Sequence, residues 1–363
     1  MFRNVRNLLR FKPRKFLGVD IGTVSIRVVE LGRRGQAYRL ENYGEVGLSF
    51  VRETPFRVYK KDTLLLSNKK IAKAINTICK EAGVQTKEAN FSIPDFCTFS
   101  TSFELPPMDK EEIPEAINYE VRPYIPLPLS EITLDWSVIS GQIGRTSLKV
   151  LVVAVPNDVI AQYQEIAQLS DLELRFLEPE IFSLVRSLIK DKAAKDQKVI
   201  SLIDIGARST TCNILEKGVL KISHTCAVAG NELTEIIARS SNMDYNKAEE
   251  LKKKFGLLLD NKVRGKDVRK IIIPLVDSIL EEIKKVFRNF YQSDGKEIEE
   301  IVLAGGTALM PGLKEYFSTE LKKEVKLANP FLGIACPPVL LETLKEMGPS
   351  YAIAVGVALK GLE

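Results

Sequence analysis

Two copies of one short pattern, lying about half a chain apart, constrain this sequence more than any other feature. Residues 16–32 and residues 199–218 each contain an apolar run, then Asp-Ile-Gly, then a step of small and hydroxyl-bearing residues, then a second apolar run. Two apolar runs on either side of a glycine-containing step predict a β-hairpin in each copy. The tip of such a hairpin offers free backbone N–H groups and hydroxyls, which suit a phosphate group.

The glycine and the aspartate of each copy suggest the chemistry. Gly22 and Gly206 can take backbone angles that other residues avoid, and they let a ligand approach closely. Asp20 and Asp204 place one carboxylate at each hairpin, where Mg²⁺ with its water shell would be held. Two such hairpins facing each other would clamp a nucleotide polyphosphate. The other tip residues expected near the phosphates are Thr23, Ser25, Arg208, Ser209 and Thr210.

A third element follows the second hairpin. Residues 298–317 contain an apolar strand, then Gly305-Gly306-Thr307, then a helix that begins near Pro311. Paired glycines after a strand let the chain pass flat against a ring or a sugar, so these three residues are expected near adenosine. With this order of elements the chain resembles the ATPase superfamily of actin, Hsp70 and the sugar kinases. The glycine pattern is not a P-loop, because G-x-x-x-x-G-K-[ST] does not occur in the sequence.

Composition excludes several classes of function. The 363 residues, 45% of them apolar, are enough for two domains with cores of their own. The formal net charge of +5 is too small to indicate nucleic acid. Five cysteines without C-x-x-C spacing favour reduced thiols in a cytosolic protein. A single histidine, His224, leaves no His/Cys metal cluster and argues against a Ser-His-Asp hydrolase.

The first fifteen residues are basic, but they lack the uninterrupted apolar core of a signal peptide. The sequence also has no stretch of ~18 apolar residues that would predict a membrane span. Apolar residues among the arginines and lysines would allow weak contact with an anionic membrane surface. The alternative is a frayed terminus, which we favour because so short a segment binds poorly alone.

The most discriminating stretch is residues 116–138. It contains Tyr124-Ile125-Pro126-Leu127-Pro128, whose prolines argue against a helix across residues 122–129, and then Leu134-Asp135-Trp136. These two motifs are not general features of actin-like ATPases. They resemble the type IV pilus assembly protein PilM family, in which phenylalanine is usual at Leu127 and lysine is usual at Arg27.

Two further segments support the resemblance. Residues 176–188 match a family segment, with Glu178 in the place of an aspartate. Residues 248–256 match a superfamily segment whose glutamate and lysine flank the ribose and the base, which here are Glu249 and Lys252. The resemblance covers nearly the whole chain after residue 15.

The resemblance implies an α/β, actin-like, two-lobed fold with one α+β subdomain relocated, as in the cell-division protein FtsA. We expect a basic segment at 1–15 and a first lobe of residues 16–45, 173–197 and 345–363. An inserted, partner-binding subdomain is expected at 46–172. The second lobe is expected at 198–344, with a helical subdomain at about 240–297.

The resemblance also implies ATP and Mg²⁺ as ligands and a place at the cytoplasmic face of the inner membrane. PilM-type proteins bind the N-terminal cytoplasmic tail of the membrane protein PilN and work with other pilus platform proteins, so membrane association is expected mainly through partners. We expect the tail to dock at Tyr124, Ile125, Pro126 and Leu127, because a rigid proline-rich turn offers apolar contact at little ordering cost. Glu180, which follows a strand between the hairpins, is the best candidate to orient water in what is at most a slow ATPase.

Two other functions remain open from the sequence. A filament-forming ATPase of the cell-division type usually ends in a tethered amphipathic helix, whereas this sequence ends just after the apolar run 351–359. A small-molecule kinase of the same superfamily would need a substrate-binding insertion and a catalytic aspartate at the cleft. Phosphate transfer to added sugars would distinguish the kinase.

Overall fold

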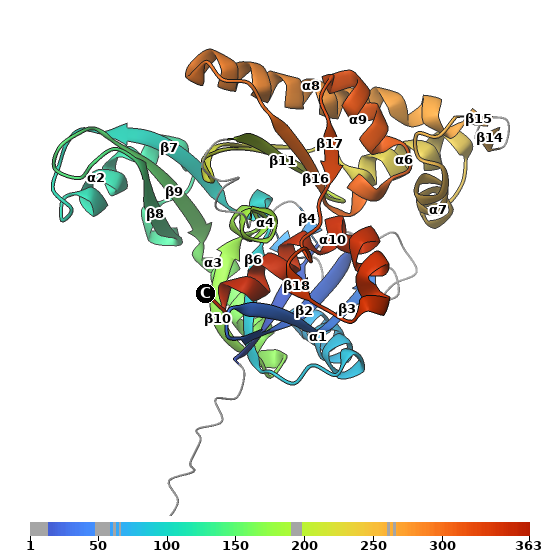
Figure 1. Ribbon diagram of the computed structural model, residues 1–363, viewed down its shortest axis with the longest axis horizontal. Helices are drawn as coiled ribbons and strands as arrows, with labels where there is room; N and C mark the ends of the chain where they lie inside the picture. Colours follow the sequence, from blue (N-terminus) through green and yellow to red (C-terminus); the bar gives the residue numbers. More distant parts are fainter. Residues whose placement is uncertain are drawn as a thin grey trace, which may run out of the picture.

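Two β-sheets form the cores of two lobes (Figure 1). They belong to a computed structural model that describes residues 14–47, 59–60, 63–64, 67–189, 198–259, 262–263 and 266–363. The strands of the first sheet are β1 Lys15–Ile21, β2 Ser25–Arg34, β3 Ala37–Gly47, β6 Glu88–Ile93, β10 Glu173–Pro179 and β18 Ile334–Ala335. The strands of the second sheet are β11 Val199–Ile205, β12 Thr210–Glu216, β13 Val219–Cys226, β16 Glu300–Ala304 and β17 Val325–Leu327.

The two sheets repeat one strand order. The first runs β10-β6-β1-β2-β3-β18 and the second runs β13-β12-β11-β16-β17. In each sheet an antiparallel meander of three strands is followed, beside its first strand, by two parallel strands. The repeat seen in the two hairpins therefore extends to five strands of each lobe, and the two-lobed α/β architecture is confirmed.

Helices α1 (Asn68–Ala82) and α3 (Asn157–Leu169) cover one face of the first sheet. Their buried side chains, among them Ile75 and Tyr163, pack with Val19 and Val28 of the sheet in one core. Gly83 ends α1 in the left-handed conformation at φ 72°.

Helices α4 (Glu180–Leu188) and α10 (Leu341–Lys360) lie between the two sheets (Figure 1). These helices pack closely because glycines lie at their contacts. A Cβ at Gly18 of β1 would lie 2.2 Å from the carbonyl oxygen of Ala354. A Cβ at Gly356 of α10 would lie 1.9 Å from the carbonyl oxygen of Ser183. The apolar run 351–359 is thus part of α10. None of the helices in the described ranges is both long and apolar enough to cross a bilayer.

Four helices cover the outer face of the second sheet, and they pack in one core with side chains such as Ile203 and Ile214. These helices are α6 Gly230–Ser241, α7 Tyr245–Phe255, α8 Val268–Asp294 and α9 Leu313–Leu321. α8 runs through Pro274 without a break. A two-stranded ribbon of β14 (Lys262–Val263) and β15 (Lys266–Asp267) precedes it. The helices in the range 240–297, which was expected to be a helical subdomain of this lobe, pack on its sheet, since α8 belongs to the same core.

A third sheet forms a separate subdomain that projects beside the first lobe (Figure 1). It has the order β7-β9-β8, with β7 Phe99–Leu105, β8 Ile132–Ser140 and β9 Leu148–Pro156, and it carries α2 Ile113–Glu120. Its own core includes Phe103, Ile117 and Val150.

The expected subdomain boundaries need correction. The range 46–172 is too wide, because β6 pairs with β1 and α1 and α3 pack on the first sheet. The second lobe ends before residue 344, because β18 pairs with β3 of the first sheet. Of the residues between β3 and α1, the structure describes only a two-stranded ribbon, β4 (Tyr59–Lys60) with β5 (Thr63–Leu64), and the serine that precedes α1. The basic segment at 1–15 lies outside the described residues, apart from Arg14 and Lys15.

The proline-rich turn is also partly different from the expectation. Short 3₁₀ turns occur at η3 (Arg122–Tyr124) and η4 (Leu129–Glu131). Pro123 lies in the first turn of η3, where its missing N–H costs no hydrogen bond. The expectation that residues 122–129 contain no helix therefore holds only for residues 125–128, between the two 3₁₀ turns.

Candidate functional site

A cavity of about 940 Å³ lies between the lobes and is lined by both of them. Its walls come from the tips of the two repeated hairpins, from α7 and α10, and from the turn after β16, which forms η5 (Gly306–Leu309). All but one of the residues expected at the cofactor line this cavity, and so does Glu180, the candidate to orient water. They are Asp20, Gly22, Thr23, Ser25, Glu180, Asp204, Gly206, Arg208, Ser209, Glu249, Lys252, Gly305, Gly306 and Thr307.

The two hairpin tips have the same geometry. The amide of Gly22 donates to the carbonyl of Ser25 at 3.0 Å, and the amide of Gly206 donates to the carbonyl of Ser209 at 3.0 Å. Each tip therefore closes as a loop of four residues. A Cβ added at either glycine would lie 3.1 Å from that same carbonyl oxygen, so a side chain would tighten both turns in the same way.

Thr210 is the exception, and the expectation that it faces phosphate is wrong. It is the first residue of β12, it is buried, and it is absent from the cavity wall. Its hydroxyl donates to the carbonyl of Val228 at 2.8 Å. Thr210 thus holds the connection between β13 and α6 rather than a ligand.

Four carboxylates lie together where the lobes meet, and one of them was not singled out from the sequence. Asp95 begins the 3₁₀ turn η2 (Asp95–Cys97), which follows β6. Its Oδ1 accepts from the amide of Ile181 at 3.3 Å, and its own amide donates to Oε2 of Glu180 at 3.3 Å. No motif marks Asp95, because it joins the group only when η2 packs against the start of α4.

Burial raises the pKa of all four carboxyl groups, those of Asp20, Asp95, Glu180 and Asp204. The pKa reaches about 7 for Asp95 and about 7 for Asp204. For Glu180, the negative charges of the other three raise the pKa further. The positive charge nearby therefore does not offset the effect of burial on these groups.

Two observations indicate what kind of cation site Asp20 and Asp204 could form. Oδ1 of Asp204 is buried and accepts no hydrogen bond from the residues that the structure describes, whereas Oδ1 of Asp20 accepts one from Ser92 at 3.1 Å. Within the described part of the chain, no three His, Cys, Asp or Glu side chains are arranged to hold a metal ion by themselves. The site therefore fits a Mg²⁺ that keeps several waters and takes few protein ligands, which is the usual habit of this ion.

Arg27 supplies the nearest positive charge. It pairs across the hairpin with Asp20, whose pKa it partly lowers against the effect of burial. Its guanidinium donates to Glu45 at 2.9 Å and lies 5.7 Å from the ring centre of Tyr351. Its Nε is buried and has no hydrogen-bond partner in the described ranges, and the residue lines the cavity. The sequence had marked this position only as a departure from lysine.

The paired glycines after β16 have different roles. Gly305 has φ 88°, and a Cβ there would lie 2.4 Å from Oδ1 of Asp204 and 2.4 Å from the carbonyl oxygen of Ile205. A Cβ at Gly306 would meet nothing closer than Arg27 at 3.9 Å, so this glycine faces open space in the cavity. Thr307 donates to the carbonyl of Gly206 at 2.8 Å and joins this turn to the second hairpin.

Lys252 and Glu249 form the wall on the side of α7. Nζ of Lys252 is buried, donates to the carbonyl of Gly230 at 2.9 Å and lies 2.7 Å from Oε2 of Glu249. Burial lowers the pKa of Lys252. For Glu249 burial acts to raise the pKa, but the charge and hydrogen bond of Lys252, with the hydrogen bond of Thr234 and the charge of Lys253, together lower it. Lys252 thus fixes the start of α6 against α7 and keeps Glu249 charged at the cavity.

A second hollow, of about 620 Å³, lies between the small sheet and the first lobe. Pro126 and Leu127 line it, together with Phe96, Phe99 and the start of α3. We call it the tail groove. The two neighbouring residues predicted for a partner do not line it: Ile125 is buried in the core of the small sheet, and Tyr124 stacks on Phe103 with ring centres 5.8 Å apart.

Phe96 lines both the tail groove and the cavity between the lobes. On the cavity side the guanidinium of Arg208 lies 4.3 Å from the centre of the Phe96 ring.

Comparison with known proteins agrees with this geometry. The family model described as type IV pilus assembly protein PilM matches residues 18–362. The chain belongs to the PilM family. A solved structure described as a PilM-PilN type IV pilus biogenesis complex is similar to this PilM family member, with a TM-score of 0.84 and 25% identity over 96% of this chain and 98% of that one.

This PilM family member is also similar to other proteins, two by sequence and one by structure. FtsA of Enterococcus faecalis is 23% identical over 90% of this chain and 81% of its own length. FtsA of Rhizobium meliloti is 25% identical over 43% of this chain and only 39% of its own length. MreB 5 of Spiroplasma citri, solved bound to AMPPNP, has 13% identity and a TM-score of 0.53, covering 95% of both chains. The actin-like fold is confirmed.

Proposed function

We propose that this chain is an ATP-binding adaptor of the type IV pilus assembly platform. It holds Mg-ATP between its lobes and binds the N-terminal cytoplasmic tail of a PilN-like inner-membrane protein. Binding to this tail keeps the chain at the inner face of the inner membrane, beside other platform proteins. One observation carries the nucleotide part: two hairpin tips of the same geometry, each with an aspartate, line one cavity with Gly306.

Each part of the cavity has a role in this proposal. Asp20 and Asp204 hold Mg²⁺ through its waters, and the hairpin tips hold the phosphates. Gly306 lies against the adenosine, and Glu249 is charged where the ribose would lie. Glu180 orients any attacking water, with Asp95 bonded to it as a positioning residue. Bound Mg²⁺ supplies the positive charge that four neighbouring carboxylates lack.

Mg-ATP should raise the melting temperature of the protein clearly. A ligand that binds only the folded state stabilises it by about 2.7 kcal/mol at one hundred times its Kd. Asp20→Ala should lose this response, because it removes a carboxylate at the metal position, whereas Glu281→Ala on the exposed surface of α8 should keep it. Thermal unfolding with ATP, with Mg²⁺ and with both measures the effect. An equal response in wild type and Asp20→Ala would contradict the nucleotide site.

The tail groove supports the partner part of the proposal. A groove between two rigid units, with proline and aliphatic side chains on one wall, suits an extended peptide that has no core of its own. The similar solved structure is described as a complex of PilM with PilN, so a PilN-like tail is the natural candidate.

Leu127→Ser should weaken binding of a synthetic PilN-like tail by about tenfold, because it removes an apolar contact from the groove wall. Tyr124→Ala is the matched control, since this exposed ring lies outside the groove and its loss should leave tail affinity unchanged. Phe96→Ala should reduce both tail and ATP binding, because Phe96 lines both sites. Fluorescence anisotropy with a labelled tail measures the first and calorimetry the second. Equal loss of tail binding from Leu127→Ser and Tyr124→Ala would place the tail elsewhere.

A further inference from the structure

The 3₁₀ turn η2 contributes to both hollows described above. Asp95 connects it to the carboxylates of the cavity, because the amide of Asp95 donates to Oε2 of Glu180 at 3.3 Å. Cys97 lines the tail groove, and Phe96 between them lines both hollows. Of the residues that the structure describes, Phe96 alone is common to the two walls. One aromatic side chain therefore stands between the proposed nucleotide and the proposed tail.

The backbone of η2 is anchored on both sides of Phe96. Pro94 before the turn is buried, and its carbonyl accepts from the amide of Cys97 at 2.8 Å. Cys97 is buried in the core of the first sheet, whereas the Phe96 side chain is only half-buried at the edge of that core. A ligand that packs against η2 would therefore act on the ring of Phe96 rather than on the backbone.

Arg208 contacts this ring from the cavity side. It lies in the tip of the second hairpin, and its guanidinium lies 4.3 Å from the centre of the Phe96 ring, where a cation is attracted to the ring face. The contact joins the two lobes, because Phe96 follows β6 of the first sheet. Arg208 also lines the cavity beside the tip residues expected at the phosphates. The same side chain thus contacts Phe96 and faces the proposed nucleotide.

Bound phosphates would act on the contact between Arg208 and Phe96. The negative charge of a polyphosphate would hold the guanidinium at the hairpin tip, and a fixed guanidinium limits the positions of the ring beneath it. A tail in the groove would limit the same ring from its other side. Ordering a side chain costs entropy, and a second ligand that meets a ring already ordered does not bear this cost again. Each ligand should therefore favour the binding of the other.

We propose that Mg-ATP and the PilN-like tail bind this chain cooperatively, and that the contact between Phe96 and Arg208 couples the two sites. This inference rests on the proposed function, from which it takes both ligands. It adds a regulation, since the nucleotide then sets how tightly the chain holds the membrane protein. The coupling is reciprocal by thermodynamic linkage, so the tail raises the affinity for nucleotide by the same factor.

The affinity of the full chain for a labelled synthetic PilN-like tail tests the coupling. Fluorescence anisotropy gives the Kd of the tail with and without saturating Mg-AMPPNP, an analogue that resists hydrolysis. We expect the nucleotide to lower this Kd at least about fivefold. Calorimetric titration of the nucleotide with and without saturating tail should give the same factor. If both ligands bind but neither changes the Kd of the other, the coupling is overturned and the proposed function stands. If either ligand fails to bind by itself, both fall.

Two variants on opposite sides of the contact test its role. Phe96→Leu keeps an apolar side chain in both walls but removes the ring face, and Arg208→Gln removes the cation. In each variant the ratio of the tail Kd without nucleotide to that with nucleotide should fall to nearly one, at nucleotide concentrations that calorimetry shows to be saturating. Phe96→Tyr and Arg208→Lys keep the ring and the cation, and they should keep the ratio. A wild-type ratio in both Phe96→Leu and Arg208→Gln would overturn the proposal.

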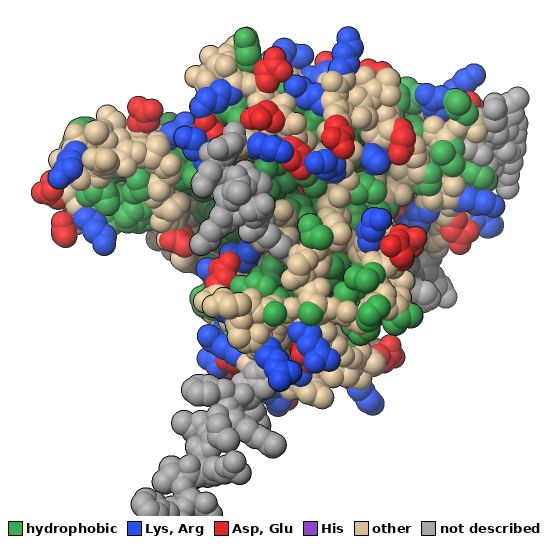
Figure 2. All heavy atoms as spheres, in the orientation of Figure 1, with side chains coloured by type: hydrophobic (Ala, Val, Ile, Leu, Met, Phe, Trp, Pro, Cys, Tyr) green, Lys and Arg blue, Asp and Glu red, His purple; other side chains and the backbone are tan. Residues whose placement is uncertain are grey.

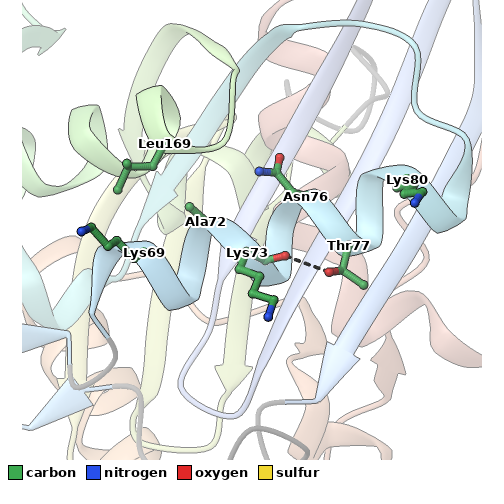
Figure 3. A pocket seen from close by; sticks show the side chains of 7 residues that line it. All are labelled: Lys69, Ala72, Lys73, Asn76, Thr77, Lys80 and Leu169. Atoms are coloured by element: carbon green, nitrogen blue, oxygen red, sulfur yellow. Dashed lines mark hydrogen bonds between the residues drawn. The ribbon is translucent and has the colours of Figure 1, made fainter.

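The matched control is Lys73→Gln on α1, which removes one positive charge as Arg208→Gln does. Lys73 is exposed in a shallow depression along α1, and none of the described residues that line this depression lines the cavity or the tail groove (Figure 3). Charged side chains of both signs are spread over the visible faces of the two lobes, so one exposed lysine is a small part of this surface (Figure 2). The control should keep the wild-type ratio. An equal loss of the ratio in Lys73→Gln and Arg208→Gln would show an effect of net charge and would overturn the role of Arg208.

Discussion

Valine in place of Gly306 should abolish Mg-ATP binding while the ligand-free protein keeps its stability. A Cβ at this position has open space around it, with Arg27 at 3.9 Å as its nearest neighbour, so the larger side chain would extend into the cavity without disturbing the fold. Under the proposed function that space belongs to adenosine, and a branched side chain would exclude it. Calorimetric titration with Mg-ATP measures the loss, and thermal unfolding without ligand measures stability.

Gly305→Val is the informative comparison. Its Cβ would collide with the carboxylate of Asp204 and the carbonyl of Ile205, and its φ of 88° is strained for any residue with a side chain. We therefore expect this variant to melt at a lower temperature as well as to lose ATP. If Gly306→Val bound ATP with wild-type affinity, adenosine could not lie against Gly306, and the proposed position of adenosine would be wrong.

Asp204→Asn should make the ligand-free protein more stable at pH 8 while it loses its response to Mg-ATP. Burial, with the charges of Asp95 and Asp20, raises the pKa of Asp204 from 3.8 to about 7. A carboxyl group whose pKa is raised on folding favours the folded state fully below pH 4, and this contribution is lost as pH rises through about 7. Above that pH the folded protein holds a buried charge without its counter-ion, at a cost of a few kcal/mol.

The amide of asparagine carries no charge, so the variant avoids this cost. The difference in free energy of unfolding between variant and wild type should be small at pH 4 and should grow towards pH 8. Urea unfolding across this pH range without ligand gives the difference, and Mg-ATP added at pH 8 should stabilise only the wild type. If the wild type were the more stable protein at pH 8 without ligand, Asp204 would not be held as an uncompensated charge.

Local signals in the sequence were sufficient for much of the secondary structure. The apolar spacing of residues 68–82 and the glycine that follows them are local helix signals, and they agree with α1 as the structure has it. Both hairpins and their glycine tips were also visible, because the residues that make a hairpin are close in sequence. The order of hairpin, hairpin and paired glycines led to the right fold, and the two motifs in residues 116–138 led to the right family.

The division into subdomains could not be predicted as well from the sequence. Residues 46–172 form one continuous stretch between the two halves of the first lobe, and the sequence does not show that the chain returns to the first sheet within it. The parallel pairing of β6 with β1 joins residues about seventy positions apart, and this pairing decides where α1 and α3 pack. No local pattern records such a contact.

The sequence by itself determined the two hairpin turns, their aspartates and the residue types around a nucleotide-sized cavity, since a turn of four residues depends on its own glycine and neighbours. Only the tertiary structure decided which side chains face that cavity. It turned Thr210 towards Val228, buried Ile125, brought Asp95 to Glu180 and left Gly306 rather than Gly305 open. The physical reason is that the direction of a side chain at the end of a strand or turn depends on which distant element packs against it.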